Sequence, residues 1–343
     1  MNISKDGHEL VNRAINGDAQ AKEGAVKIVK ENSSAIQSFI NAISQESNGF
    51  IFGRKTSMGY PSKDILTGKE VLLYKLLLLE ASWYESQKLY QNAEVDYIAA
   101  TRFLLHLSQQ KYEILVARII LGTCFNLGYP YLEENIINNS FSREYKRNIL
   151  NNLLMMQNSQ DFLESAIIEE KDSCKNAAMD AAQGIEDQIK AGKSFEEIFD
   201  YSWMDPNAPQ KKILTVEQSK ELTSLIDQEF IEEYTRMINT WIEKLYNAAI
   251  SAVKDNDASI FENAKKEFSS AAEEFKNPVK KILFILQAAS GDKKSVKKQM
   301  ADLNAMIFLT VASPDYSKVV KRYYDFDYKL KSLIELVSKK VGE

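Results

Sequence analysis

The chain has 343 residues, of which 45% are hydrophobic and 27% charged, and its formal net charge is −5. This composition is typical of a globular protein and excludes a disordered or collagen-like chain, while the negative charge argues against bulk binding of nucleic acid. The 13 glycines and 6 prolines are too few for the turns of a β-sandwich or barrel, and two cysteines exclude both a disulfide framework and a four-thiolate zinc site.

Helix-start signals begin close to the N-terminus. Asp18 is typical of a helix N-cap and predicts a helix that runs to about residue 31. Ser33 or Ser34 is expected to begin a second helix, which ends near residue 45. Two helices are therefore predicted between residue 18 and residue 45.

The segment from residue 46 to residue 67 is the least regular part of the chain. It holds Gly49, Gly53 and Gly59, followed by Pro61. A loop of this length without periodicity is uncommon in a compact domain. Its apolar residues, including Phe52 and Tyr60, favour a loop packed on the body of the protein over a free linker.

The boundary signals in the rest of the chain are also typical of helices. Thr67 and Glu70 have the spacing of a capping box and precede a strongly apolar helix. Further boundaries are predicted from the same kinds of signal: helix ends at Gly128 with Pro130 and at Gly192, helix starts at Ser159, Ser194, Thr215 and Asn277 with Pro278, and limits of the last helices at Gly291 and Pro314. Since no long run alternates apolar and polar residues, the fold is predicted to be all-α and built from irregular antiparallel helical hairpins.

A proline-containing segment from Trp203 to Lys212 is the best candidate for a domain boundary. It divides the chain into an N-terminal helical domain, 1–205, and a C-terminal helical bundle, 212–343. The bundle is expected to begin with one helix of about 40 residues, from Thr215 to Asp255, roughly 60 Å long at 1.5 Å per residue. Such a helix should either join two lobes or bend.

One predicted hairpin has a more specific pattern. Counted from Leu77, small and aromatic residues recur at fixed spacing, at Ala81, Tyr84, Ala93, Tyr97 and Ala100. The small residues allow two antiparallel helices to approach closely, and this stretch of about 34 residues resembles a tetratricopeptide repeat. Glu80 stands where that family usually has leucine, and Leu105 where it has the closing proline. No second copy follows, so we expect a single repeat-like hairpin in an irregular helical fold.

The resemblance implies which residues face a bound partner. The positions that line the concave face in the family fall on Lys75, Leu78, Ser82, Glu85 and Ser86. Members that grip a terminal carboxylate place a lysine and an asparagine four residues apart there, whereas this chain has Leu78 and Ser82. The sequence therefore does not support binding of a peptide's terminal carboxylate. The candidate partner-binding residues are Lys75, Ser82, Glu85 and Ser86, with Phe52 and Tyr60 of the loop.

The sequence holds no recognisable catalytic, metal or nucleotide motif. Its two histidines, His8 and His106, lack a second histidine at helical spacing, and a calcium-loop-like start at Asp255 fails at Ile260. Glycine-rich phosphate loops and the Gly-x-Ser-x-Gly elbow are absent. Apolar neighbours around Cys124 predict a buried, inert thiol, and Cys174 is also expected to be buried. We therefore expect no metal, no cofactor and no enzyme activity.

Charge is unevenly distributed along the chain. Residues 161–200 hold 11 acidic and 4 basic residues, and residues 276–343 hold 14 basic and 7 acidic ones, a net of +7. Both are expected to be solvated helix faces, including the lysines between 293 and 298. The sharper alternative is that the acidic segment is a docking surface for a basic partner.

These observations lead to two hypotheses about function. The first is a non-enzymatic helical scaffold or adaptor that binds a protein or peptide in a groove between helical hairpins. The alternative is a small-molecule or lipid carrier, or a hydrolase, with a pocket under the loop 46–67; a deep pocket that holds two perturbed carboxylates would favour it. No stretch of 18 uncharged apolar residues occurs, so no membrane span is expected. Compartment and oligomeric state stay open.

Overall fold

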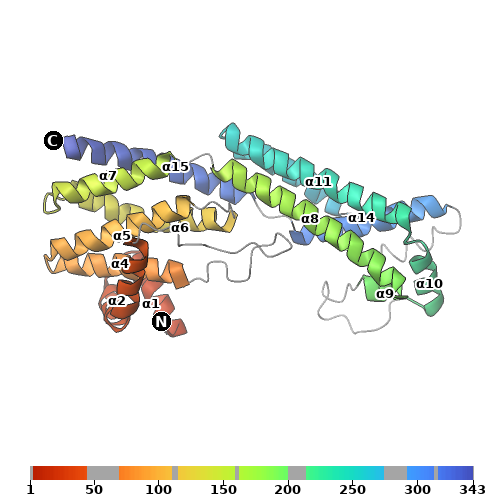
Figure 1. Ribbon diagram of the computed structural model, residues 1–343, viewed down its shortest axis with the longest axis horizontal. Helices are drawn as coiled ribbons and strands as arrows, with labels where there is room; N and C mark the ends of the chain where they lie inside the picture. Colours follow the sequence, from red (N-terminus) through yellow and green to blue (C-terminus); the bar gives the residue numbers. More distant parts are fainter. Residues whose placement is uncertain are drawn as a thin grey trace. The chain divides into compact units, whose positions relative to one another are not determined.

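A computed structural model describes residues 3–44, 69–109, 115–158, 162–199, 214–273, 292–312 and 316–342. Within these ranges the regular secondary structure is α-helical and no strand occurs, so the protein is all-α, as predicted. In chain order the helices are α1 (Lys5–Ile15), α2 (Ala19–Glu31), α3 (Ser33–Ser44), α4 (Lys69–Ser86), α5 (Tyr90–Ser108), α6 (Leu115–Ile137), α7 (Arg143–Gln157), α8 (Phe162–Lys190), α9 (Phe195–Ile198), α10 (Val216–Ser224), α11 (Gln228–Lys254), α12 (Ala258–Glu273), α14 (Lys293–Ala312) and α15 (Tyr316–Gly342) (Figure 1). None of the helices described is long and apolar enough to cross a bilayer.

The chain forms two compact units. The first unit comprises Met1–Ala166 with Val319–Glu343, and the second comprises Ile167–Lys318. The predicted boundary at Trp203–Lys212 lies outside the described residues, and the units divide the chain elsewhere than the predicted domains 1–205 and 212–343. Most of α15 belongs to the first unit because its side chains pack there: the ring of Phe326 meets that of Phe125 edge-on, with centroids 4.8 Å apart.

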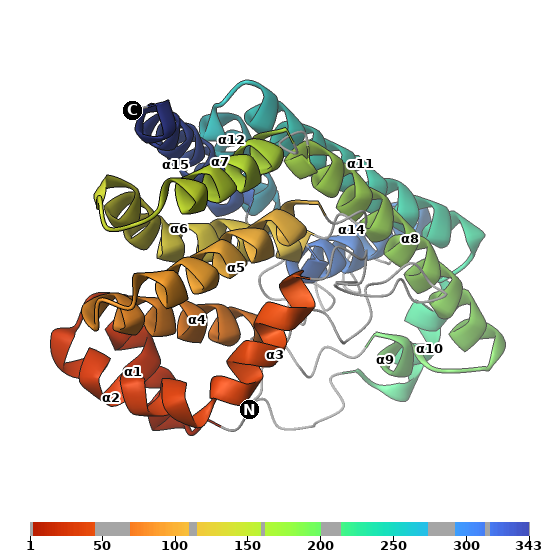
Figure 2. The same cartoon turned by 60° about the vertical axis from the view of Figure 1, so that its left-hand side comes forward.

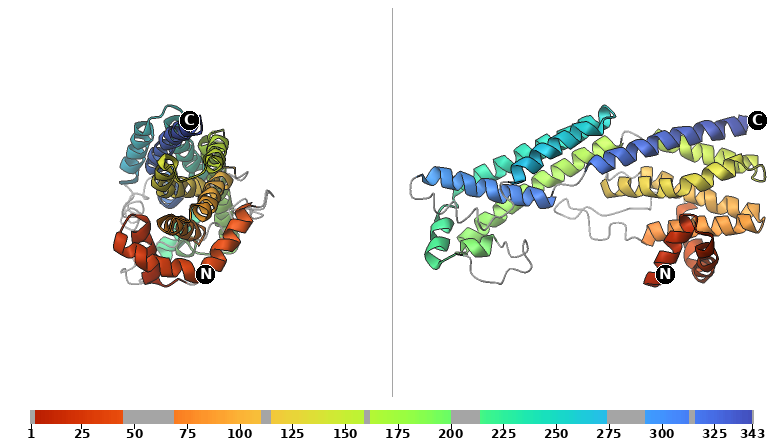
Figure 3. Two further views of the ribbon diagram at one scale, coloured as in Figure 1. Left: turned by 90° about the vertical axis from the view of Figure 1, so that its left-hand side faces the viewer. Right: turned by 180° about the vertical axis from the view of Figure 1, so that it is seen from behind.

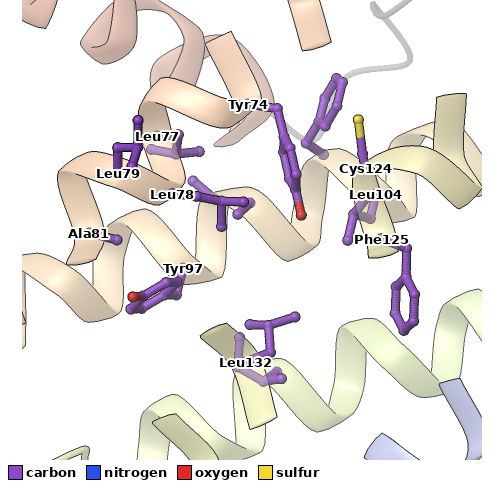
Figure 4. Packing of buried hydrophobic residues seen from close by; sticks show 14 of the residues in the cluster. Tyr74, Leu77, Leu78, Leu79, Ala81, Tyr97, Leu104, Cys124, Phe125 and Leu132 are labelled. Carbon is purple, nitrogen blue, oxygen red and sulfur yellow. The ribbon is translucent and has the colours of Figure 1, made fainter. Parts of the chain in front are cut away.

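The first unit is built on the α4–α5 hairpin. Small side chains, Ala81 on α4 and Ala93 and Ala100 on α5, are buried where the helices meet. This core also contains many leucine and aromatic residues, among them Tyr74 and Tyr97 (Figure 4). Helices α1 to α3 pack along one side of the hairpin (Figure 2), and α6 and α7 also contact α5.

Several predicted helix boundaries are confirmed. Asp18 caps α2 by accepting a hydrogen bond from the backbone N–H of Ala21 at 3.0 Å. Ser194 begins α9 and Thr215 begins α10, each with a capping box. Gly192 follows α8 with φ +74°, a conformation that costs glycine little. These boundaries depend on local chemistry, which is why the sequence reveals them.

The predicted helix end at Gly128 is wrong. Helix α6 continues through Gly128 and Pro130 to Ile137. The glycine serves close packing instead, because a Cβ built there would lie 2.2 Å from the hydroxyl oxygen of Tyr74. Tyr74 is fully buried on α4, so its side chain has little room to move away.

The single long helix predicted from Thr215 to Asp255 is also wrong. It is divided into α10 and α11, and both lie in the second unit. Leu225 and Ile226 are buried at the break, and Asp227 caps α11 by accepting a hydrogen bond from the N–H of Phe230 at 3.2 Å. The apolar periodicity continues across the break, so it hides the new cap.

Helices α11 and α14 lie side by side in the second unit (Figure 3). Two lysines of α14, which were expected on a solvated face, instead join these helices. Lys297 pairs with Asp227 and with Glu229, the latter at 3.2 Å, and Lys298 pairs with Glu233 at 3.1 Å. The lysine cluster is therefore partly engaged within the fold.

Candidate functional site

A pocket of about 560 Å³ opens between α3, α4 and α5 in the first unit. Its volume lies within the range of ligand sites. The lining is mostly polar and consists of Ser33, Ser34 and Gln37 from α3, Glu80 and Tyr84 from α4, and Gln91, Asn92, Val95 and Asp96 from α5. No lysine, arginine or histidine is among these residues, so the charge that the described side chains contribute to the lining is negative.

The hairpin sequence explains why two carboxyl groups meet here. Glu80 directly follows the buried run that ends at Leu79, and it lies half-buried on the flank of α4. Asp96 precedes the buried Tyr97 on α5 and is only 4% exposed. Because α3 packs against both helices of the hairpin, it closes one side of the space into which these acids face.

Asp96 is the most unusual residue of the pocket. Its Oδ2 atom is buried and has no hydrogen-bond partner within the described part of the chain. Burial, with a smaller contribution from the nearby charge of Glu80, raises the pKa of Asp96 from its ordinary value of 3.8 to about 8. A buried acceptor without a partner is costly, so a hydrogen-bond donor that reached this oxygen from the pocket would relieve that cost.

Glu80 shares this environment. Burial raises the pKa of its carboxyl from 4.5 to about 7. Tyr84 stands beside both acids: its pKa is raised by burial and then by the charges of Glu80 and Asp96. Both carboxyls are thus weaker acids than usual, and a bound cation would offset this effect by pairing with their ionised forms.

The pocket also has one apolar contact surface. Val95 lines it and is 54% exposed, which is high for a large apolar side chain. The ring of Tyr84 lies beside that of Trp83, with centroids 5.0 Å apart. An aliphatic chain that ends in a cation could therefore contact Val95 and Tyr84 while its charged end reaches the acids.

The predicted partner-binding residues that the structure describes are not among those that line this pocket. Lys75 donates a hydrogen bond to Asn12 Oδ1 of α1 at 2.7 Å. Glu85 accepts hydrogen bonds from the hydroxyl of Tyr97 and the side-chain amide of Asn138, both at 3.4 Å. Their part in partner binding stays a prediction.

The other predicted binding residues are also placed apart from the pocket or cannot be placed. Ser82 is half-buried, and the hydroxyl of Ser86 donates to the carbonyl of Trp83 at 2.6 Å. Phe52 and Tyr60 lie outside the described residues, and so does the alternative pocket under their loop. The proposed roles of these four residues remain untested predictions as well.

One signal for the pocket was present in the sequence. Glu80 departs from the leucine of the repeat pattern, and this departure alone does not indicate a pocket. Asp96 stands in the apolar stretch from Val95 to Ala100 and gave no motif. A charged residue at a buried helical position was the available clue, and it pointed to the site only once both acids were placed together.

The cysteines show no catalytic arrangement in the described part of the chain. Cys124 is fully buried, as predicted, and burial raises its pKa to about 12. His106 is directed elsewhere, with Nε2 3.0 Å from the carbonyl oxygen of Ile43. Cys174 is half-buried rather than buried, and its Sγ lies 2.9 Å from the hydroxyl of Tyr246. Over the described ranges, no group of three or more His, Cys, Asp or Glu side chains is placed to hold a metal ion.

Comparison with known proteins adds no family to this description. No protein-family model, no curated protein and no solved structure matches the chain.

Proposed function

We propose that this protein is a non-enzymatic helical adaptor that binds a basic protein or peptide, and that the pocket between α3, α4 and α5 receives an arginine or lysine side chain of the partner. The observation that carries the proposal is the buried, unpartnered carboxylate oxygen of Asp96 in the wall of an open pocket. Glu80 supplies a second acid, and no basic residue among the described lining neutralises either.

The chemistry of the lining favours a cation with several N–H donors. The carboxylates of Asp96 and Glu80 accept charge-assisted hydrogen bonds, and such bonds are stronger than neutral ones. The side-chain amides of Gln37, Gln91 and Asn92 add further acceptor oxygens around them. Arginine and lysine combine such donors with an aliphatic stem, which matches Val95.

The proposal is tested with a fluorescent, N-acetylated and C-amidated hexa-arginine peptide, whose binding is followed by anisotropy at physiological ionic strength. We expect saturable binding that the double variant Glu80→Gln, Asp96→Asn weakens at least about ten-fold, because it removes both charges and keeps the side-chain shapes. The variant should fold, since neutral amides remove the cost of burying charge.

The matched control is the double variant Glu9→Gln, Glu23→Gln, which removes the same net charge from exposed positions on α1 and α2. It should change the affinity less than about two-fold. Equal weakening in both variants would show nonspecific attraction and overturn the proposal, as would a failure of the wild-type protein to bind the peptide. Competition by spermine at lower concentrations than by the unlabelled peptide would identify a free polyamine instead of a peptide as the preferred source of the cation.

A second candidate function is acid–base hydrolysis, which the raised pKa values of Glu80 and Asp96 favour. A carboxyl group that titrates near pH 7 can both donate and accept a proton there. Turnover of a panel of p-nitrophenyl glycosides, lost in Glu80→Gln, would support this alternative. If the protein binds the peptide but does not turn over any glycoside of the panel, the adaptor function is favoured over hydrolysis.

A further inference from the structure

We infer that Asp96 and Glu80 release protons when a cationic group enters the pocket, so that capture of the partner exchanges protons for a cation. This inference rests on the proposed function and adds its regulation: partner affinity should depend on pH close to neutrality. It follows from the arrangement of two acids in one partly dehydrated space.

Two ionised carboxylates in the empty pocket would be energetically costly. Asp96 is 4% exposed, and its Oδ2 atom lacks a hydrogen bond from the described residues, so an ionised Asp96 would be neither well hydrated nor fully paired. Glu80 places a second charge of the same sign nearby. Without a ligand, a proton kept on the pair of carboxyls reduces both the cost of burying a charge and the repulsion between the two acids.

Among the described residues that line the pocket with Asp96, none carries a positive charge that would stabilise its ionised form. From α4, Glu80 and the hydroxyl-bearing ring of Tyr84 face it, while α3 contributes the uncharged Ser33, Ser34 and Gln37 to the same space. Helices α6 and α7 pack on α5 from elsewhere, and no charged side chain described on them acts on Asp96. The titration is therefore set by the two acids themselves.

A cation reverses this balance. When a guanidinium group donates to Asp96 and Glu80, it pairs with their charged forms and lowers the pKa of both. Since the ordinary pKa values of 3.8 and 4.5 are raised to about 8 and about 7 in the empty pocket, the protons leave near neutral pH. Binding and proton release are then linked.

Isothermal titration calorimetry measures this exchange directly. The unlabelled hexa-arginine peptide is titrated into the full-length protein between pH 6 and pH 9, in paired buffers of different ionisation enthalpy. Arginine stays protonated throughout this range, so any protons released come from the protein. We expect about one proton released per bound peptide at pH 7 and almost none at pH 9, with affinity rising up to about ten-fold per pH unit below neutrality.

The variants separate this inference from the proposed function. Asp96→Asn should bind the peptide more weakly and release fewer protons, whereas the Glu9→Gln, Glu23→Gln control should release as many as the wild type. Binding without proton release at any pH would overturn the inference and leave the proposed function standing. Undiminished release in Asp96→Asn would assign the protons to other groups and overturn it too. Failure of the wild type to bind at every pH would overturn both.

Discussion

Replacing Asp96 by asparagine should stabilise the protein relative to the wild type. The gain in free energy of unfolding should be about 2 to 4 kcal/mol larger at pH 9 than at pH 5. The folded protein holds a proton on Asp96 up to about pH 8, whereas the unfolded chain loses it near the ordinary value of 3.8. The folded state therefore binds more protons between these values, and wild-type stability contributed by this group falls as the pH rises through that window.

The asparagine variant lacks this titration, so its stability should vary less with pH. Below about pH 4 the two proteins should differ little, since the carboxyl is then neutral in both the folded and the unfolded state. Urea denaturation followed by circular dichroism at pH 5, 7 and 9 measures the difference. Glu9→Gln, at an exposed position, is the control, and its difference from the wild type in free energy of unfolding should change by less than about 0.5 kcal/mol across the range. A constant difference between Asp96→Asn and the wild type at all pH values would contradict the burial of an uncompensated acid.

Gly128→Ala should destabilise the protein by about 2 to 4 kcal/mol. The added Cβ would lie 2.2 Å from the hydroxyl oxygen of Tyr74 and 3.4 Å from its Cζ. Tyr74 is enclosed by the core, and its ring lies 5.6 Å from that of Phe103. Relief therefore requires α4 and α6 to separate, which disturbs contacts well beyond the glycine.

Tyr74→Phe provides a direct test of that explanation. The Tyr74 hydroxyl is buried without a hydrogen-bond partner among the described residues, so its removal should be nearly neutral alone. Combined with Gly128→Ala, it should recover at least about 1 kcal/mol, because the clashing oxygen is gone. Gly122→Ala on the same helix is the control: its Cβ meets no described atom within 4 Å, and it should not destabilise the fold. Equal effects of the two alanine substitutions would contradict the packing account.

The parts of the fold that the sequence predicted correctly depend on neighbouring residues. Asp18, Ser194 and Thr215 cap helices through hydrogen bonds within a few positions, so their roles are visible in the sequence alone. Gly128 looks like a helix terminator locally, but its role depends on Tyr74 of another helix. The cap at Asp227 is difficult to recognise in the sequence because apolar residues recur on both sides of the helix break at which it lies.

The candidate site could be predicted only in part. Glu80 interrupts an apolar run, and that irregularity was visible. Its meaning depended on Asp96 across the hairpin and on α3, whose placement beside both helices is a tertiary feature. The repeat pattern points to Lys75 and Glu85, but in the structure their side chains contact Asn12 and Tyr97 instead of this pocket.

The most direct test of the account is the NMR titration of the Asp96 side-chain carboxyl carbon in the full-length protein, with and without saturating hexa-arginine peptide. We expect a midpoint near pH 8 in the free protein, the value that burial and Glu80 impose, and a clear downward shift when the peptide is bound. A midpoint near the ordinary value of 3.8 in the free protein, or a midpoint that the bound peptide leaves unchanged, would contradict it.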